Sequence, residues 1–437
     1  MIMKSACLLL ILLFCSFAQA KHKTEWSLHI DTKFDAVYFA EEYGTDTNQD
    51  LYKLELDPIY DWRYLDSVRF YVKPTFIANP NNKSDEEKYF FDPTETYLRY
   101  QGESFSLQAG YNVFTWGVTD GYNPLDVINS KQYFDPLHSR KLGAPSVVFS
   151  QTLDIWDYEL IYIPENRGAT LPGEQSRWLP REVFVPQTPD NDLVLLLPES
   201  LHYNYGSKED LDDARKNNYA LRIQRHGSVF DVGLTYFEGV ASFPLIQPVV
   251  TGTVVAVSPK TIVQVDPDVT LNVKNYRIRQ GGLSMTASSW ETLFKLASSY
   301  TSSLTEDPYL QKWTFENVLA IEKTFNLGES GLLIAVLQKS FIQTEKENDS
   351  NLSMTEIFRD AWMLGGRMSW KEVWNFSLLG LYDGIHGSNY EELTITRRFW
   401  DAWNLSLTAS LIQGSSETPL GVYEKNDSYT LTLSRSF

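Results

Sequence analysis

Apolar and polar residues alternate along most of this chain with a period of two. The stretches from Leu28 to Ala36 and from Leu405 to Leu411 both follow this rule. Because successive side chains of a β-strand point to opposite sides, this period predicts strands with one apolar and one polar face. We find 18 such segments, near residues 26–40, 50–60, 67–78, 93–101, 104–114, 145–152, 156–163, 218–226, 229–240, 274–287, 291–301, 313–325, 331–342, 358–370, 373–383, 390–400, 403–412 and 428–437.

The connections between these segments alternate between tight turns and long loops. This alternation is typical of bacterial outer-membrane barrels, which have short periplasmic turns and longer external loops. We therefore predict an all-β fold, a transmembrane antiparallel up-and-down β-barrel of about 16–18 strands. Within it, the long connections 164–217 and 241–273 are expected to be external loops, and the second is expected to form a hairpin around Thr251–Pro259.

Tryptophans gather beside the short turns. Such amphipathic rings favour the depth of lipid headgroups, so they predict one rim of the barrel. The alternative is a soluble β-sandwich, but such a chain would be expected to split into domains well before 400 residues. The tryptophans expected at this rim are Trp290, Trp370, Trp374, Trp400 and Trp403.

The first residues have the three parts of a secretory signal peptide. Lys4 precedes an apolar run from Ala6 to Phe17, and Ala18-Gln19-Ala20 forms an A-x-A cleavage site. We expect residues 1–20 to be removed and residues 21–437 to form a single barrel domain in the cell outer membrane. Both cysteines, Cys7 and Cys15, lie in this leader, so the mature chain is expected to form no disulfide.

Composition narrows the possible functions. The chain has 437 residues, 14% aromatic residues, a formal net charge of −18 and a mean hydropathy of −0.29. That hydropathy is too polar for a bundle of membrane helices, and the acidity argues against a nucleic-acid partner. No G-x-S-x-G or H-E-x-x-H motif is present, so we predict no enzyme, no catalytic residues, no metal site and no cofactor.

One long connection, residues 115–144, carries more local order than a loop tip requires. Asp120-Gly121 is a turn pair, and Asn123 followed by Pro124 predicts a short helix near Pro124–Ser130, with Asp126 returning to the cap. This segment either folds inward and narrows the barrel or merely seals one wall. Its candidate residues are Trp116, Asp120, Asn123, Pro124, Asp126, Asp135, Arg140 and Lys141.

The stretch Trp116–Asp126 reads W-G-x-x-D-x-x-N-P-x-D. It resembles a segment of porin-like outer-membrane β-barrels of Gram-negative bacteria, a largely uncharacterised family. The resemblance implies an outer-membrane location and a role in passage or export, without a known substrate.

Alternation also predicts which charges face the interior. A charge on the lipid face near the midplane costs about 2–4 kcal/mol, which favours inward placement. These charges either orient solutes across a pore or only pair with their neighbours. On this basis Ile278 is expected to face lipid, and the interior charges are Asp31, Asp35, Glu55, Asp57, Arg69, Lys73, Arg99, Arg222, Arg277, Arg279 and Lys295.

The last strand resembles the assembly signal of outer-membrane barrels. Tyr429, Leu431, Leu433 and the terminal Phe437 share one face, whereas Arg435 departs from the pattern. The expected partners are therefore outer-membrane lipid and lipopolysaccharide, the barrel-assembly machinery and small solutes. The favoured function is a porin-like channel narrowed by residues 115–144. The alternatives are a non-conducting barrel for lipid or polymer export or for surface binding, and, less favoured, a hydrolase. The oligomeric state stays open.

Overall fold

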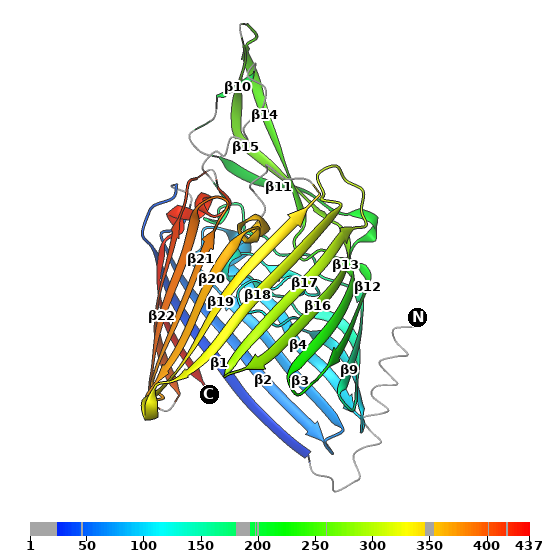
Figure 1. Cartoon of the computed structure of the whole chain (residues 1–437). Coiled ribbons are helices and arrows are strands. Elements are labelled where there is room, and N and C mark those ends of the chain that lie inside the picture. The colour runs from blue at the N-terminus through cyan, green and yellow to red at the C-terminus, as the bar shows by residue number, and fades with distance from the viewer. Residues whose placement is uncertain are drawn as a thin grey trace.

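The alternating segments form a closed barrel of 18 antiparallel strands (Figure 1). The computed structural model describes residues 24–44, 47–180, 193–196, 198, 201–258, 260–345, 354–400, 402–416 and 418–437, so the predicted leader lies outside the described residues. The first nine barrel strands are β1 (Thr24–Phe39), β2 (Asp50–Tyr64), β3 (Val68–Ala78), β4 (Tyr89–Gln101), β5 (Phe105–Asn112), β8 (Ala144–Leu153), β9 (Trp156–Glu165), β12 (Lys216–Arg225) and β13 (Phe230–Val240).

The second half of the chain completes and closes the wall. Because β1 pairs with both β2 and β24, no edge strand remains in the barrel. Each of the 18 predicted segments overlaps one barrel strand, and the predicted fold class is confirmed. The remaining strands are β16 (Arg277–Ser289), β17 (Thr292–Ser303), β18 (Trp313–Asn326), β19 (Gly331–Thr344), β20 (Ala361–Trp370), β21 (Trp374–Asp383), β22 (Ser388–Phe399), β23 (Trp403–Gln413) and β24 (Ser428–Ser436).

The outer face of the wall is a band of exposed apolar side chains. Leu54 of β2, Leu407 of β23 and Leu431 of β24 are exposed on it, as predicted. Residues between them point the other way, and Glu55 is buried. Within the described residues, no helix is long and apolar enough to cross a membrane.

The short turns at one end of the barrel contain few residues. Trp290 and Glu291 form a two-residue turn with φ of 50° and 57°. Lys371 and Glu372, with φ of 51° and 57°, begin the three-residue turn between Trp370 and Trp374. Positive φ at both residues of a two-residue turn matches the right-handed twist of the flanking strands. The predicted rim tryptophans lie here, and Trp290 is 90% exposed.

The closing seam joins the first and last strands. Leu433 lies opposite Phe34, and the Phe437 and Ile30 backbones exchange hydrogen bonds of 3.0 and 3.2 Å. Tyr429 is exposed on the outer face with Leu431. The Arg435 guanidinium, which departs from the expected apolar pattern, lies 4.2 Å from the ring centroid of Phe437.

At the other end, a small four-stranded sheet rises beyond the barrel (Figure 1). The hairpin predicted within 241–273 is present, as β14 (Leu245–Ala256) paired with β15 (Thr261–Asn275). β15 also pairs in parallel with β10 (Leu193–Leu196) and β11 (His202–Asp210). The other short elements are β6 (Lys131–Gln132), β7 (Arg140–Lys141), α2 (Asp85–Lys88) and the 3-10 helices η1 (Pro136–His138), η2 (Leu211–Asp213), η3 (Gly328–Ser330), η4 (Met354–Phe358) and η5 (Gly421–Asn426).

Candidate functional site: the segment that crosses the barrel

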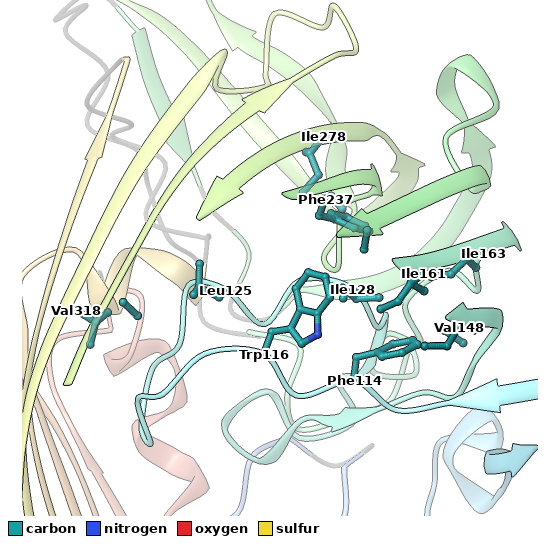
Figure 2. Close-up of a cluster of buried hydrophobic side chains, with 14 residues drawn as sticks. Phe114, Trp116, Leu125, Ile128, Val148, Ile161, Ile163, Phe237, Ile278 and Val318 are labelled. Atoms are coloured by element: carbon teal, nitrogen blue, oxygen red, sulfur yellow. The ribbon is translucent and has the colours of Figure 1, made fainter. Parts of the chain in front are cut away.

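The connection from β5 to β8, residues 115–144, is hereafter the inner segment. It begins in an apolar cluster on the inner side of the wall, where Trp116 is 2% exposed (Figure 2). Leu125 and Ile128 of the segment join the same cluster. Barrel strands on several sides supply the rest, including Val148, Ile161, Ile163, Phe237, Ile278 and Val318.

The helix predicted over 124–130 does not form. The Asn123 side chain instead closes a loop, because Nδ2 donates to the Trp116 carbonyl at 2.6 Å and Oδ1 accepts from the Leu125 N–H at 3.1 Å. Asp126 does not return to a cap but lies 3.4 Å from Lys131 Nζ and 2.5 Å from Lys141 Nζ. A helix of seven residues is marginal without tertiary support, and here packing and ion pairs favour an irregular path.

The base of the inner segment is fixed by Asn129, a residue that sequence analysis missed. Its Oδ1 accepts from the Phe114 N–H at 2.8 Å, and its Nδ2 donates to the Asn112 and Leu142 carbonyls at 2.9 and 2.8 Å. These bonds join the two ends of the inner segment. A buried amide with all its bonds made stabilises one backbone path.

Trp116 also makes a polar contact with the wall. Its indole Nε1 donates to Glu159 Oε1 of β9 at 2.8 Å. Glu159 lies 3.5 Å from Arg222 of β12, whose guanidinium lies 5.8 Å from the Trp116 ring centroid. This corner of the inner segment is therefore fixed to β9 and β12.

The tip of the inner segment reaches strands far from β5 and β8. Asp120 lies 2.9 Å from Lys295 Nζ of β17 and 3.3 Å from Arg367 Nη2 of β20. The Tyr122 carbonyl accepts from Gln338 of β19 at 2.9 Å, and the Tyr122 hydroxyl donates to Glu316 of β18. These partners lie on the inner face, so the tip crosses the barrel interior to the β17–β20 wall.

A further contact with the wall lies where the inner segment runs from its tip back toward β8. Asp135 caps η1 by accepting from the N–H groups of Leu137 and His138. The His138 ring lies 2.8 Å from Asp135 and 2.6 Å from Glu392 of β22. Burial lowers the pKa of His138, but hydrogen bonds to Asp135 and Glu392 outweigh it and raise the pKa to about 10. Arg140 adds an ion pair to Glu55 of β2, four strands away from β22 around the wall.

Most of the charged residues that were predicted to be interior occupy inward-facing positions of their strands. Most of them also lie beside a residue of opposite charge. Asp35 lies 3.1 Å from both Lys33 and Lys53, and Arg69 lies 2.8 Å from Asp61. Lys295 lies 2.7 Å from Glu322 as well as beside Asp120. The inner-face positions are Asp31, Asp35, Glu55, Asp57, Arg69, Lys73, Arg99, Arg222 and Lys295.

Arg277 and Arg279 were predicted to face the interior, and that prediction is wrong. They share the face of Leu283 and Met285, which are exposed on the outer wall, while Ile278 is buried beside the inner segment. The apolar side chain is needed inside because Trp116 and Leu125 pack there. Both arginines instead lie beside Glu238 of β13, at distances of 3.4 and 3.0 Å.

Two cavities lie along the inner face of β19–β22, and the tip of the inner segment lines one of them. One of about 270 Å³ is lined by Asp120, Met363, Arg367 and Glu392, among other residues. A second of about 230 Å³ continues along polar residues of β20, β21 and β22. Arg367 lines both cavities and its side chain is 65% exposed. The polar side chains of the second cavity are Arg367, Ser369, Asn375, Ser377, Thr394 and Thr396.

The start of the long connection after β9 also folds back over the barrel. Arg177 is buried, and it donates to the carbonyls of Glu41, Asn48 and Lys425 at 2.9, 3.0 and 2.5 Å. Its Nε also donates to Asn426 Oδ1 at 3.1 Å. Burial lowers the pKa of Arg177 to about 10. One guanidinium thus ties three external connections together, so this part of 164–217 is not a free loop.

Comparison with known proteins identifies the fold and leaves the family open. No protein-family model matches the chain, and no curated protein does. Pseudomonas aeruginosa OpdK, solved with vanillate, is similar at 8% identity and a TM-score of 0.50, over 94% of this chain and 98% of that one. Acinetobacter baumannii OccAB4 is similar at 8% identity and a TM-score of 0.49, over 95% and 99%. At such identity the likeness to OpdK shows a shared barrel fold.

Proposed function

We propose that the protein is an outer-membrane channel for small polar or charged solutes, narrowed by the inner segment. One observation carries this proposal: the inner segment crosses the interior of an 18-strand barrel and bonds to the far wall through Asp120 and Tyr122. A barrel of this size is wide enough for water unless something fills it. The inner segment fills part of it and leaves two cavities along β19–β22 whose linings include polar and charged side chains.

The outer surface supports the proposed location. A closed wall with an apolar outer band satisfies the backbone within a bilayer, and tryptophans at one rim suit the headgroup depth. The leader predicted at residues 1–20 and the C-terminal pattern fit the same route of export and assembly. We therefore infer that lipopolysaccharide and other outer-membrane lipid surround the barrel.

The cavities indicate which charges meet a solute. Arg367 is exposed in both cavities, and among the described residues its ion-pair partner is Asp120, at 3.3 Å. Lys295, in contrast, is held between Asp120 and Glu322. We infer that Arg367, with Asp120 beside it, sets the ion preference of the narrowest path.

Single-channel recording in planar bilayers tests this function. Deletion of residues 122–132 removes the Tyr122 contacts with β18 and β19 and shortens the inner segment, so we expect higher conductance. Arg367→Glu changes the local charge by two units. At roughly 6 Å from a passing ion in water this is worth about 1.4 kcal/mol, so the cation-to-anion permeability ratio should rise at least about tenfold.

Arg225→Glu is the matched control, because Arg225 lies on the outer face of β12 near a short turn, 5.6 Å from the Phe230 ring centroid. It should leave conductance and selectivity unchanged. If neither the wild type nor the deletion conducts, the alternative of a non-conducting barrel for export or surface binding would replace this proposal.

A further inference from the structure

Two arginines stand on the outer wall at the long-connection end of β16. The strand register places Arg279 between Glu238 of β13 and Ser302 of β17. One outward position nearer the middle of the barrel, Gly281 lies between Tyr236 and Tyr300. The outward positions of Arg279 and Glu238 thus form a charged row. It lies next to an aromatic row formed by Tyr236 and Tyr300. Since aromatic rings mark the membrane interface, the charged row lies at headgroup depth if the barrel sits in the outer membrane as proposed.

The charged row carries an excess of positive charge. Arg279 donates through Nε and Nη2 to Glu238 Oε2 at 3.1 and 3.0 Å. Arg277 donates to Glu238 Oε1 at 3.4 Å and to the carbonyls of Lys216 and Asn217 at 2.7 Å. Two guanidinium groups share one carboxylate, and the Arg279 side chain remains 52% exposed. The carboxylate therefore orients Arg279 without neutralising the pair.

The wall is open directly beside these arginines. A Cβ added at Gly281 would meet no heavy atom within 4 Å, although Tyr236 and Tyr300 flank this position. Leu283, the next outward residue toward the middle of the barrel, is exposed and apolar. An extended hydrocarbon chain fits this arrangement, with its polar head at Arg279 and its tail over Gly281 and Leu283.

We propose that Arg277, Arg279 and the opening at Gly281 form a binding site for a phosphorylated lipid of the outer leaflet. Guanidinium groups bind phosphate oxygens through paired, charge-assisted hydrogen bonds. The chain as a whole has a formal net charge of −18, which repels an anionic lipid surface. A local cationic site at headgroup depth offsets that repulsion. The inference rests on the proposed membrane location and not on conduction.

Titration of the detergent-purified barrel with lipid A, followed by native mass spectrometry, tests the site. The double variant Arg277→Ala, Arg279→Ala removes the exposed phosphate donor Arg279 and the second positive charge beside it, and Gly281→Leu fills the opening. We expect each to weaken lipid A binding about tenfold, the scale of losing a charge-assisted contact. Lipid A without its phosphates should bind the wild type as weakly as lipid A binds the double variant.

Two control variants separate this site from general surface effects. Arg225→Ala removes a cation from the opposite end of the outer wall. Gly380→Leu fills another glycine position with no atom within 4 Å, which lies opposite Glu391 instead of a cation. Both should bind lipid A like the wild type.

Unchanged binding in the double variant, equal binding of the dephosphorylated lipid, or full displacement by inorganic phosphate would overturn the proposal. These outcomes are measured as lipid binding and not as ion conduction, so they do not depend on whether the protein is a channel.

Discussion

His138 links the inner segment to β22, and its charge determines the strength of that link. Its ring lies between two carboxylates, Asp135 and Glu392, and the Tyr390 hydroxyl lies 3.2 Å from Nε2. Because the pKa is raised to about 10, the imidazolium persists at neutral pH. The stabilisation is fully present below the unfolded pKa of about 6.5 and is lost as pH rises through about 10.

We therefore expect one histidine of the folded barrel to titrate near pH 10. The measurement is NMR of ¹³C-labelled histidine in detergent micelles between pH 5 and pH 11. His138→Gln should remove that signal and leave the other histidine signals in place. A His138 resonance that titrates near 6.5 would show that the two carboxylates do not hold the ring in the folded protein.

Residues that act mainly through tertiary contacts are difficult to identify from sequence patterns. The charge pattern indicated Asp120 and Lys295 as interior residues, and in the structure they form an ion pair. Asn129 and Arg177, which fix the inner segment and the external connections, stand in no recognisable motif. Most of their partners are backbone carbonyls outside their own turn of chain, and every residue type supplies a carbonyl. Sequence reasoning therefore finds charged pairs more readily than buried amides.

At the scale of elements, β16 shows where a period of two is informative and where it is ambiguous. Alternation located the strand within a few residues, but it assigned Ile278 to lipid and its arginine neighbours to the interior. The usual rule of apolar outside fails there because the inner segment requires an apolar surface inside the barrel. Because side chains alternate between the two faces of a strand, assigning one residue to the other face reassigns every residue of that strand. The packing of Ile278 against the inner segment therefore reverses the assignment for the whole of β16.

Nitroxide labels test these faces directly. At Leu54 and Leu283 the label should be quenched by oxygen, which concentrates in lipid. At Glu55 and Ser284 it should be quenched by a water-soluble nickel complex, because those positions point into the barrel. Power-saturation measurements in lipid vesicles give both accessibilities. Leu283 and Ser284 behaving in the opposite sense would restore the face assignment made from sequence and contradict the structure of β16.

The inner segment illustrates a second limit at this scale. Asn123 and Pro124 favour a helix start locally, yet residues 124–130 take an irregular path. Local propensity contributes a few tenths of a kcal/mol to about 1 kcal/mol per residue, and it is readily outweighed by burying Leu125 and Ile128. A capping pattern thus predicts the start of an ordered segment better than it predicts a helix.

At the scale of the whole molecule, the number of strands followed from the number of turns and loops. Nine long connections and eight short ones require 18 strands, and antiparallel neighbours need only local pairing rules. The parallel pairing of β15 with β10 and β11 was not predicted. It joins distant parts of the chain, and no periodicity encodes which distant strand becomes the partner. The sequence therefore predicts the barrel wall well and the external sheet only in part.

Closure of the barrel depends on the last strand, and Phe437 has two separable roles there. Its backbone makes two of the bonds to β1, while its exposed ring lies 6.5 Å from Trp403. We expect deletion of Phe437 to lower the amount of folded protein in the outer membrane strongly, because the terminal aromatic is proposed to be read by the assembly machinery. Refolding into lipid vesicles should change little, since the described residues of β24 keep their register with β1 and β23. Phe437→Tyr, which keeps the ring, is the matched control and should assemble normally. Equal losses in cells and in vesicles would instead mean that the residue acts only through the stability of the seam.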